Sequence, residues 1–483
     1  MMFLGIDIGT SGVKAIIVDE HDREVASAAA PLAVQRPQPL WAEQDPEAWW
    51  RATCAALDQL AAEAAERMGE VAAIGLSGQM LGVTLLDETD APIRPALLWN
   101  DGRATAECAA LRERVSDFID LTGAPPMPGF PAPKLLWLAR HEPQAIARTR
   151  RVLLTKDYVR LHLTGEAATD LADGSATLLM ETEAGRWSAR LADACGISVA
   201  HLPRLVESGA VSGALRGTLA QRWGLRAGLP VAGGAGDNMC GAVGAGVVQR
   251  GDAVISLGTS GVFFAANDRF VPARGQGMHT HRHAVAGLYG HNGCVLSAAA
   301  AFAWIMEIVK ADDAATFLAA IEAADLAPDA VPVFTPYLTG ERTPHDDAAA
   351  TATFSGLRIG MGALHLGRAV LDGVAFALAD CRDALAAAGA PIARLMLVGG
   401  GARSAYWAGI IATVFDQQLS IPAQAALGPA LGAARLARQA VGGPLIGADA
   451  EEIAVIPRPD LRDAYAAQRE VYRRHYAALG RAE

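Results

Sequence analysis

Two short turns in this sequence carry residue types that can bind phosphate. Residues 9–12 read Gly-Thr-Ser-Gly, residues 258–261 repeat the same four letters, and each turn follows an apolar run typical of a strand. Glycine allows backbone N–H groups to approach phosphate oxygens, the hydroxyls add donors, and Lys14 adds a positive charge. One such turn alone would more often be a plain tight hairpin. Two matched turns, together with the glycine loop at residues 399–401, favour phosphate binding.

Two aspartates lie where they could take part in phosphate chemistry. Asp7 interrupts an apolar strand directly before the first turn, so its carboxylate needs a partner, and next to phosphates a hydrated Mg²⁺ ion is a natural one. A carboxylate that only caps the turn is the alternative. Asp237 follows a glycine-rich strand end and precedes a segment of small residues typical of a helix. It could cap that helix or accept a proton from a substrate hydroxyl, and the spacing does not choose between these roles.

Two further segments stand out without indicating one chemistry. His279, His281 and His283 alternate and would share one face of a strand, which could indicate a metal site. Because no carboxylate or cysteine is spaced to complete such a site, we expect solvated or packing side chains. Residues 335–345 are polar and bounded by proline. They could line a cleft or form a well-packed surface loop, and the sequence favours neither.

Composition and missing motifs exclude several classes of protein. The chain has 483 residues, of which 52% are apolar, so two or three domains with large buried cores are expected. It contains 41 Lys and Arg against 52 Asp and Glu, a net charge of −11, without a basic tract, so we expect no nucleic acid and no membrane as partner. A G-x-x-x-x-G-K-[ST] motif is absent and no G-x-G-x-x-G is complete, which argues against a P-loop or a dinucleotide fold.

The cysteines and the N-terminus predict a cytoplasmic protein. The six cysteines are widely spaced and contain no C-x-x-C, as expected for reduced thiols rather than disulfides. The first residues lack the basic region of a signal peptide, and Asp7 interrupts their apolar run.

Hydrophobic spacing predicts short strands that alternate with long helices, the pattern of an α/β protein. Strands are expected at residues 2–8, 13–19, 71–77 and 395–398. One helix should begin at Pro46, with Asp45 as its cap, and end at Gly69. Other helices are expected around residues 371–385, after residue 428 and from about residue 460.

Residues 6–14 and 255–263 form an internal repeat. The string Gly-Thr-Ser-Gly-Val recurs after 249 residues, each time behind an apolar strand. This repeat predicts two similar domains, at residues 1–249 and 250–483. The copies differ where chemistry would differ, because Asp7 and Lys14 of the first become Ser256 and Phe263 of the second.

Together these motifs make the chain similar to the FGGY family of carbohydrate kinases over nearly its whole length. That family belongs to the superfamily of sugar kinases, heat-shock ATPases and actin. The resemblance implies an α/β fold of two actin-like (ribonuclease H-like) ATPase domains, related by the internal repeat, on either side of a catalytic cleft. It is carried, in chain order, by residues 5–14 (GIDIGTSGVK), 39–46 (PLWAEQDP), 98–103 (LWNDGR), 129–141, 233–238 (GGAGDN), 337–345 (YLTGERTPH), 355–372 and 398–404 (VGGGARS).

The resemblance also implies roles for single residues. ATP would lie mainly on the second domain and the sugar mainly on the first. Asp237 would be the general base, and Asp7 would hold Mg²⁺ through water. The residues implied for ATP are Thr10, Ser11, Lys14, Gly258, Thr259, Gly400, Gly401 and Ser404, and those implied for the sugar are Gln79, Met80, Leu81, Asp237 and Asn238.

Within the family the chain resembles the kinases that convert D-xylulose and ATP to D-xylulose 5-phosphate and ADP. One position departs, since residues 79–82 read Gln-Met-Leu-Gly where those kinases have Gln-Met-His-Gly. Leucine cannot make the hydrogen bond that histidine offers to a hydroxyl. A kinase for another ketose or polyol (ribulose, arabinitol or glycerol) is therefore an alternative, and a non-catalytic nucleotide switch is a more distant one. The expected partners are a small-molecule sugar and ATP, and a homodimer is in keeping with the family.

Overall fold

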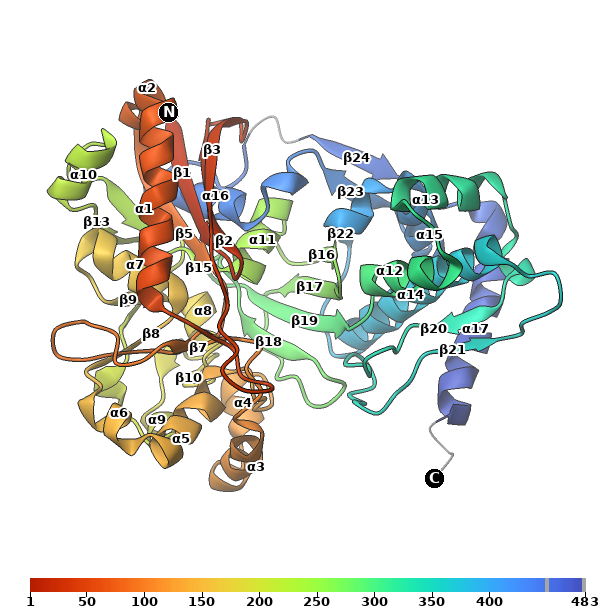
Figure 1. Ribbon diagram of the computed structural model, residues 1–483, viewed down its shortest axis with the longest axis horizontal. Helices are drawn as coiled ribbons and strands as arrows, with labels where there is room; N and C mark the ends of the chain where they lie inside the picture. Colours follow the sequence, from red (N-terminus) through yellow and green to blue (C-terminus); the bar gives the residue numbers. More distant parts are fainter. Residues whose placement is uncertain (448–450, 480–483) are drawn as a thin grey trace.

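The computed structural model describes residues 1–447 and 451–479. Its backbone forms two lobes, each built around a seven-stranded sheet, with the N-terminal sheet at one end of the long axis and the C-terminal sheet toward the other (Figure 1). Apolar side chains fill separate cores beside each sheet, as the alternation of strands and helices predicted.

The first sheet has the order β13-β14-β5-β1-β2-β3, and β15 adds to β5. β1, β2 and β3 run antiparallel, whereas β5 is parallel to β1 and β14 is parallel to β5. The bounds are β1 (Met2–Ile8), β2 (Gly12–Val18), β3 (Glu24–Pro31), β5 (Val71–Gly78), β13 (Val211–Ala214), β14 (Pro230–Ala232) and β15 (Ala235–Gly236).

The second sheet repeats this arrangement in the order β18-β19-β17-β16-β22-β23-β24. Three antiparallel strands, β19, β17 and β16, are again followed by parallel β22 and β23. The shared strand order is what the internal repeat predicted. The bounds are β16 (Asp252–Leu257), β17 (Gly261–Asn267), β18 (His279–Arg282), β19 (Tyr289–Val295), β22 (Arg394–Val398), β23 (Leu419–Pro422) and β24 (Glu452–Val455).

The two glycine turns differ in length by one residue. Ile8 pairs with Val13 across the first turn, but Leu257 pairs with Gly261 across the second. The residue opposite Asp7 is Lys14, whereas the residue opposite Ser256 is Val262. The sequence repeat aligned Lys14 with Phe263, but in the structure the residue equivalent to Lys14 is Val262. The alignment is therefore wrong at this position, because a one-residue shift turns each side chain to the other face of its strand.

The helix expected from Pro46 to Gly69 is two helices. Asp45 accepts a hydrogen bond from the Glu47 N–H, and α1 (Pro46–Glu63) begins as predicted. Ala64 then leaves the helical conformation with φ −137°, and α2 (Ala65–Gly69) follows as a separate short helix in which Met68 is buried. The prediction of one helix was wrong because no glycine or proline marks the break.

One helix of each half packs against the other half. α16 (Pro429–Ala440) covers β1 and β5 of the first sheet, where Phe3, Ile16 and Ala73 share a core with Ala430 and Ala434. α11 (Asp237–Ala245) lies between the two sheets, with Val243 in a core that includes residues of β16, β17 and β22. In Figure 1 these two helices lie side by side between the lobes. The lobes are thus joined by exchanged helices as well as by the chain.

The remaining helices and strands surround the two sheets. Between the strands of the first half lie α3 (Thr105–Arg114), α4 (Phe118–Thr122), α5 (Pro131–His141), α6 (Pro143–Arg148), α7 (Thr155–Thr164), α8 (Leu171–Ser175), α9 (Ala189–Ala194) and α10 (Gly217–Trp223), with short strands β4 (Glu43–Gln44), β6 (Thr84–Leu86), β7 (Ala96–Leu97), β8 (Arg151–Leu153), β9 (Ala168–Asp170), β10 (Met180–Glu181), β11 (Arg186–Trp187) and β12 (Arg204–Val206). The second half adds α12 (Ala299–Val309), α13 (Ala314–Ala323), α14 (Ala363–Ala387), α15 (Ala405–Phe415) and α17 (Arg462–Leu479), with β20 (Val333–Thr335) and β21 (Thr353–Ser355).

The two segments for which the sequence left the role open, residues 279–283 and 335–345, contain buried side chains. His279, His281 and His283 are buried on and beside β18, and the ring of Phe130 lies 5.5 Å from that of His279. Within the described part of the chain, no group of three metal-ligating side chains is found. Glu341 and Thr343 of the polar loop are buried as well, so that loop is packed. Among the described helices, none is both long enough and apolar enough to cross a membrane.

Candidate active site

Asp7 lies near the end of β1, between Lys14 of β2 and Ser77 of β5. Its Oδ1 accepts a hydrogen bond from Ser77 Oγ at 2.8 Å. Burial raises the pKa of the Asp7 carboxyl, while the Ser77 bond and the charge of Lys14 act in the opposite direction. The strand pairing thus places one carboxylate and one cation together at the mouth of the first turn.

The first turn is held in place by side chains from three other segments. Thr10 Oγ1 donates to Gln79 Oε1 at 3.0 Å and accepts from Trp99 Nε1 at 3.0 Å. Gln44 Nε2 donates to the Thr10 carbonyl at 2.8 Å, and Gln79 Nε2 donates to Gln44 Oε1 at 2.7 Å. Gln79 is buried and both ends of its amide are bonded within the protein. Gln79 therefore stabilises the first turn through hydrogen bonds inside the protein. The neighbouring residue Ser11 is exposed.

Residues 80–82 form a tight turn that follows β5. Met80 is buried, and its Cγ lies 2.4 Å from where a Cβ on Gly236 would be, so these two segments are in close contact. Leu81 is half-buried and has φ +68°, a left-handed conformation that is uncommon for leucine. The Leu81 carbonyl accepts a hydrogen bond from Lys134 Nζ at 2.9 Å.

Asp237 is the first residue of α11 and directly follows β15. Its Oδ1 accepts from the backbone N–H of the exposed Asn238 at 2.8 Å. Burial, and after it the charges of the nearby Asp7 and Asp173 carboxylates, raise the pKa of the Asp237 carboxyl to about 8, although the hydrogen bond from the Asn238 N–H acts in the opposite direction. This carboxyl is poised to exchange a proton near neutral pH, which is what general acid–base chemistry requires.

The second turn packs against a helix N-terminus. The carbonyls of Gly258 and Thr259 accept from the N–H groups of Ala299 and Ala298, at 2.9 and 3.0 Å, at the start of α12. The turn thus lies at the positive end of that helix, which favours an anion. The hydroxyl-bearing Thr259 is exposed.

The glycine loop after β22 lies next to the second turn. Gly399 has φ +95°, and a Cβ there would be 2.7 Å from the Leu257 carbonyl, directly before Gly258. Gly400 is exposed, and Ser404 Oγ accepts from the Trp407 N–H at 3.2 Å as the cap of α15. This capping hydrogen bond uses one lone pair of the Ser404 hydroxyl oxygen, and the exposed surface of the loop at Gly400 stays open.

A cavity of about 250 Å³ brings the two halves of the candidate site together. Asp237 and Asn238 line it from α11, Ser256 lines it from β16, and Gly399 lines it from the loop after β22. The other residues that line the cavity are Gly241, Ala242, Gly244, Ala245, Val254, Val262, Phe264, Val398, Ala425, Gly428 and Pro429. The cavity is not lined by Gln79, Leu81 or Lys14. The cavity therefore joins the predicted base to Gly399 at the start of the glycine loop, and none of the residues predicted to contact ATP is among those that line it.

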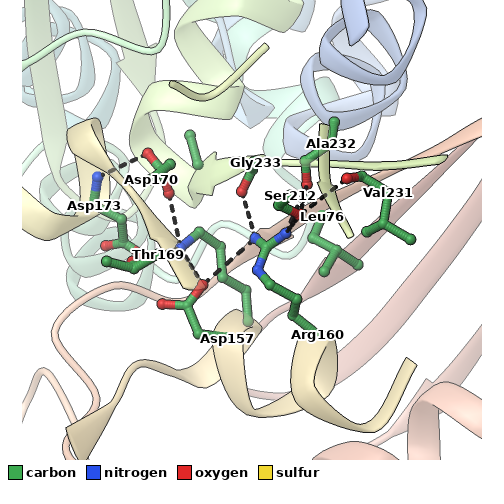
Figure 2. A network of polar contacts seen from close by, with 12 residues as sticks. Leu76, Asp157, Arg160, Thr169, Asp170, Asp173, Ser212, Val231, Ala232 and Gly233 are labelled. Carbon is green, nitrogen blue, oxygen red and sulfur yellow. Dashed lines mark hydrogen bonds and ion pairs between the residues drawn. The ribbon is translucent and has the colours of Figure 1, made fainter. Parts of the chain in front are cut away.

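A buried charge network lies behind Asp237 and was not predicted. Lys156 Nζ is 2.8–3.0 Å from carboxylate oxygens of Asp157, Asp170 and Asp173. Figure 2 shows these three aspartates with Arg160, which also donates to the carbonyls of Ala232, at 2.7 Å, and Gly233. The network thus holds the strand that leads to Asp237.

A compositional signal could have pointed to this network. The chain has only four lysines, Lys14, Lys134, Lys156 and Lys310, among 41 basic residues. Lys134 and Lys156 are both fully buried. Two of the four lysines thus lie in the core, where a compact ammonium group can pair with several buried oxygens.

The oxygen donors at the site fit a hydrated divalent cation. Asp7 and Asp237 lie close enough for the Asp7 charge to raise the pKa of Asp237, and both carboxylates are partly buried. A bound cation would relieve that repulsion. Mg²⁺ is typically held by one or two carboxylates, with water and substrate phosphates completing its shell, so a compact protein cage is not required.

Two actin-like lobes, each with a glycine turn between paired strands, and a cavity lined from both lobes define the class of the protein, a nucleotide-dependent phosphotransferase. Models of the FGGY family of carbohydrate kinases match this chain over both halves, the N-terminal domain at residues 2–244 and the C-terminal domain at residues 253–441. The chain belongs to this family and is an ATP-dependent sugar kinase.

Relatives in sequence and structure extend over the full length. The xylulose kinase of Escherichia coli (strain K12) is 42% identical over 99% of each chain, and that of Bacillus subtilis (strain 168) is 33% identical over 90% of this chain and 87% of its own. The crystal structure of a "xyloylose kinase" from Brucella ovis superposes with a TM-score of 0.96 at 42% identity, covering 100% of both chains. A xylulose kinase from Rhodospirillum rubrum gives 0.93 at 31% identity, covering 99% of both.

Proposed function

We propose that this enzyme transfers the γ-phosphoryl group of ATP to D-xylulose and releases D-xylulose 5-phosphate and ADP. Relatives that are named xylulose kinases and cover the whole chain support this substrate. The observation that carries the proposal is the cavity of about 250 Å³ that Asp237 and Asn238 share with Ser256 and Gly399. It supports transfer between a sugar held by the first lobe and a nucleotide held by the second.

In this proposal Asp237 accepts the proton of the attacking sugar hydroxyl as the bond to phosphorus forms. Its position at the start of α11 and its contact with the Asn238 N–H fix the direction of its carboxylate. Asn238 is exposed at the same helix start and can hydrogen-bond a sugar hydroxyl. Met80 and Leu81 form the neighbouring wall of the sugar site, and Gln79 supports that wall through Thr10.

The phosphate groups of ATP are proposed to lie between the two turns. Ser11, Lys14 and the backbone of the first turn would face the γ-phosphate, and Thr10 would add its N–H group. Gly258 and Thr259 would bind the other phosphates, and Gly400, Gly401 and Ser404 would follow the adenosine. Asp7 would hold Mg²⁺ through water, and that ion would neutralise the charge of the phosphates. Phosphoryl transfer depends mainly on such positioning and charge neutralisation in line with the leaving oxygen.

Leu81 favours a second candidate within the same class, a kinase for another ketose or polyol. Its side chain offers no hydrogen bond, so the loop loses a contact that a polyol substrate could use. The partners in either case are a sugar and ATP. A homodimer and a cytoplasmic location stay predictions.

The test of the substrate is ADP release with Mg²⁺-ATP and a panel of D-xylulose, ribulose, arabinitol and glycerol. We expect kcat/KM to be highest for D-xylulose. A higher value for another sugar would select the second candidate and make Leu81→His the first variant to examine. If no sugar stimulated ADP release, a nucleotide switch would replace the kinase.

The test of the base is Asp237→Asn, which keeps the shape of the side chain and removes its proton acceptor. We expect kcat to fall by about 10²–10⁴-fold, the usual contribution of a positioned general base. ATP binding, followed by equilibrium titration, should stay close to wild type. Near-full turnover of Asp237→Asn would show that the assignment is wrong.

A further inference from the structure

Lys134 of α5 lies fully buried beneath the turn that carries Leu81. Its Nζ donates to the Leu81 carbonyl at 2.9 Å and to the Leu97 carbonyl at 3.4 Å. Its side chain is 0% exposed. Throughout the described part of the chain, no carboxylate lies within ion-pair distance of this ammonium group.

This position is unfavourable for a charge. Burial lowers the pKa of Lys134 to about 7; the charge of Asp101 raises it and that of Arg103 lowers it. Asp101 is already paired with Arg103 at 2.7 Å, and Arg103 also pairs with Glu43 at 2.7 Å. A buried charge without a paired counterion lowers stability, and an apolar side chain of the same length would remove that cost but leave the Leu81 carbonyl without its donor. What Lys134 contributes is therefore its hydrogen bonds to two backbone carbonyls.

The ammonium group holds two segments of the sugar-facing wall. Leu81 has φ +68°, and its carbonyl turns inward to Lys134 rather than to a backbone N–H. Leu97 belongs to β7. Its carbonyl also accepts a hydrogen bond at 3.0 Å from the N–H of Val83, the residue directly after the turn. One lysine thus fixes the turn and the strand that leads toward Trp99.

The start of α5 contacts the same wall a second time. A Cβ on Gly129, two residues before the helix, would lie 2.2 Å from the Trp99 carbonyl. Trp99 in turn donates to Thr10 Oγ1 in the first turn. The segment that carries Lys134 therefore touches both the Leu81 turn and the Trp99 loop, and its position determines their separation.

We propose that Lys134 is a positioning residue that holds the Leu81 turn in its sugar-binding conformation through the Leu81 carbonyl. This inference rests on the proposed function, in which residues 80 and 81 form a wall of the sugar site. Lys134 does not touch the sugar or ATP. It acts by fixing the backbone on which the sugar-facing side chains stand.

Two neutral variants separate the hydrogen bond from the shape of the side chain. Lys134→Met keeps the length and loses the donor, so we expect the KM for D-xylulose to rise by about tenfold, the usual effect of losing a hydrogen bond to a charged group. Lys134→Gln keeps an N–H donor and should show a smaller rise. In both variants kcat and the KM for ATP should change by less than about twofold. The Tm is measured alongside, because Lys134→Met removes a buried charge and also leaves the Leu81 carbonyl without its donor. Lys310→Met, the same change at the exposed end of α12, is the matched control.

Each outcome bears on the proposal directly. A wild-type KM for D-xylulose in Lys134→Met would overturn it. Equal rises in the KM for sugar and for ATP, with a lower Tm, would assign Lys134 a purely structural role and would also overturn it. If the wild-type enzyme used none of the sugars, the proposed function would fail first. Titration of D-xylulose binding without ATP then shows whether the site itself still depends on Lys134.

Discussion

At the scale of single residues, the candidate site is governed by carboxylates that burial makes hard to ionise. Asp237 lies near the charges of Asp7 and Asp173, and its pKa is raised to about 8. Asp173 itself is fully buried beside Lys156, and its pKa is raised to about 7, chiefly by burial. A base with such a pKa is incompletely ionised at neutral pH, so the activity should respond to pH in the physiological range.

The first prediction is an acid limb in the pH profile. A general base acts only when deprotonated, so a raised pKa means that activity is present above about pH 8 and lost as pH falls below it. We expect kcat/KM for D-xylulose to fall by about tenfold per pH unit on that limb. An aspartate of ordinary pKa would give a flat profile from pH 6 to 9. Initial rates at low Mg²⁺-ATP across this range decide between the two, because a bound cation would itself lower the pKa of Asp237.

The second prediction concerns Asp173, whose Oδ1 would lie 3.1 Å from a Cβ on Gly236, the residue before Asp237. Asp173→Asn removes a negative charge that raises the pKa of Asp237, so the acid limb should move to lower pH. Turnover at high pH should remain. Asp193→Asn, an exposed aspartate of α9, should leave the profile unchanged. An unshifted limb in Asp173→Asn would show that its charge does not reach the base.

At the scale of elements, α16 lies unusually close to the first sheet. A Cβ on Gly5 of β1 would be 2.0 Å from the Ala430 carbonyl, and one on Gly75 of β5 would be 1.8 Å from the Ala433 carbonyl. Glycine is required at both positions because helix backbone, which cannot move aside, occupies the space of a side chain. α16 can therefore pack this closely on the first sheet because Gly5 and Gly75 have no side chains.

The third prediction follows from that fit. Gly75→Ala should force α16 away from β5 and destabilise the protein by about 1–3 kcal/mol, the usual cost of overpacking. Gly69→Ala, at the end of α2, meets no atom within 4 Å and should be close to neutral. Thermal unfolding of both variants is the measurement, with a clearly lower Tm for Gly75→Ala alone. Equal Tm values would mean that the helix adapts.

Most elements were predictable because their signals are local. The hairpin of β1 and β2, the cap at Asp45 and the start of α16 at Pro429 all depend on neighbouring residues. The break at Ala64 and the one-residue difference between the two turns were not predictable. Both are decided by what the segments pack against, and no residue type marks them.

At the scale of the whole molecule, the last part of the chain completes the first lobe. Asp22, in the turn between β2 and β3, is fully buried. Its carboxylate lies 2.9 Å from guanidinium nitrogens of both Arg435 and Arg438 on α16. Residues more than 400 positions apart are therefore joined by buried ion pairs that tie α16 to the first lobe.

The fourth prediction tests this dependence. Asp22→Asn leaves two buried guanidinium groups without their counterion, so we expect a loss of about 3–5 kcal/mol in stability. Asp460→Asn breaks a comparable pair with Arg458 on the surface, and it should cost at most about 1 kcal/mol. Thermal unfolding compares the two. A similar small effect in both variants would mean that α16 is held by apolar packing alone.

The sequence by itself determined the family, the two-lobed α/β fold and the residues whose chemistry is proposed, because glycine turns, caps and short motifs are local patterns. The tertiary structure alone decided which of these residues meet. It placed Asp237 and Ser256 on one cavity, turned the Gln79 amide into the protein, and buried Lys134 beneath the Leu81 turn and Lys156 among three aspartates. These outcomes depend on contacts between distant segments, and a buried charge takes its energy from surroundings that no stretch of neighbouring residues specifies.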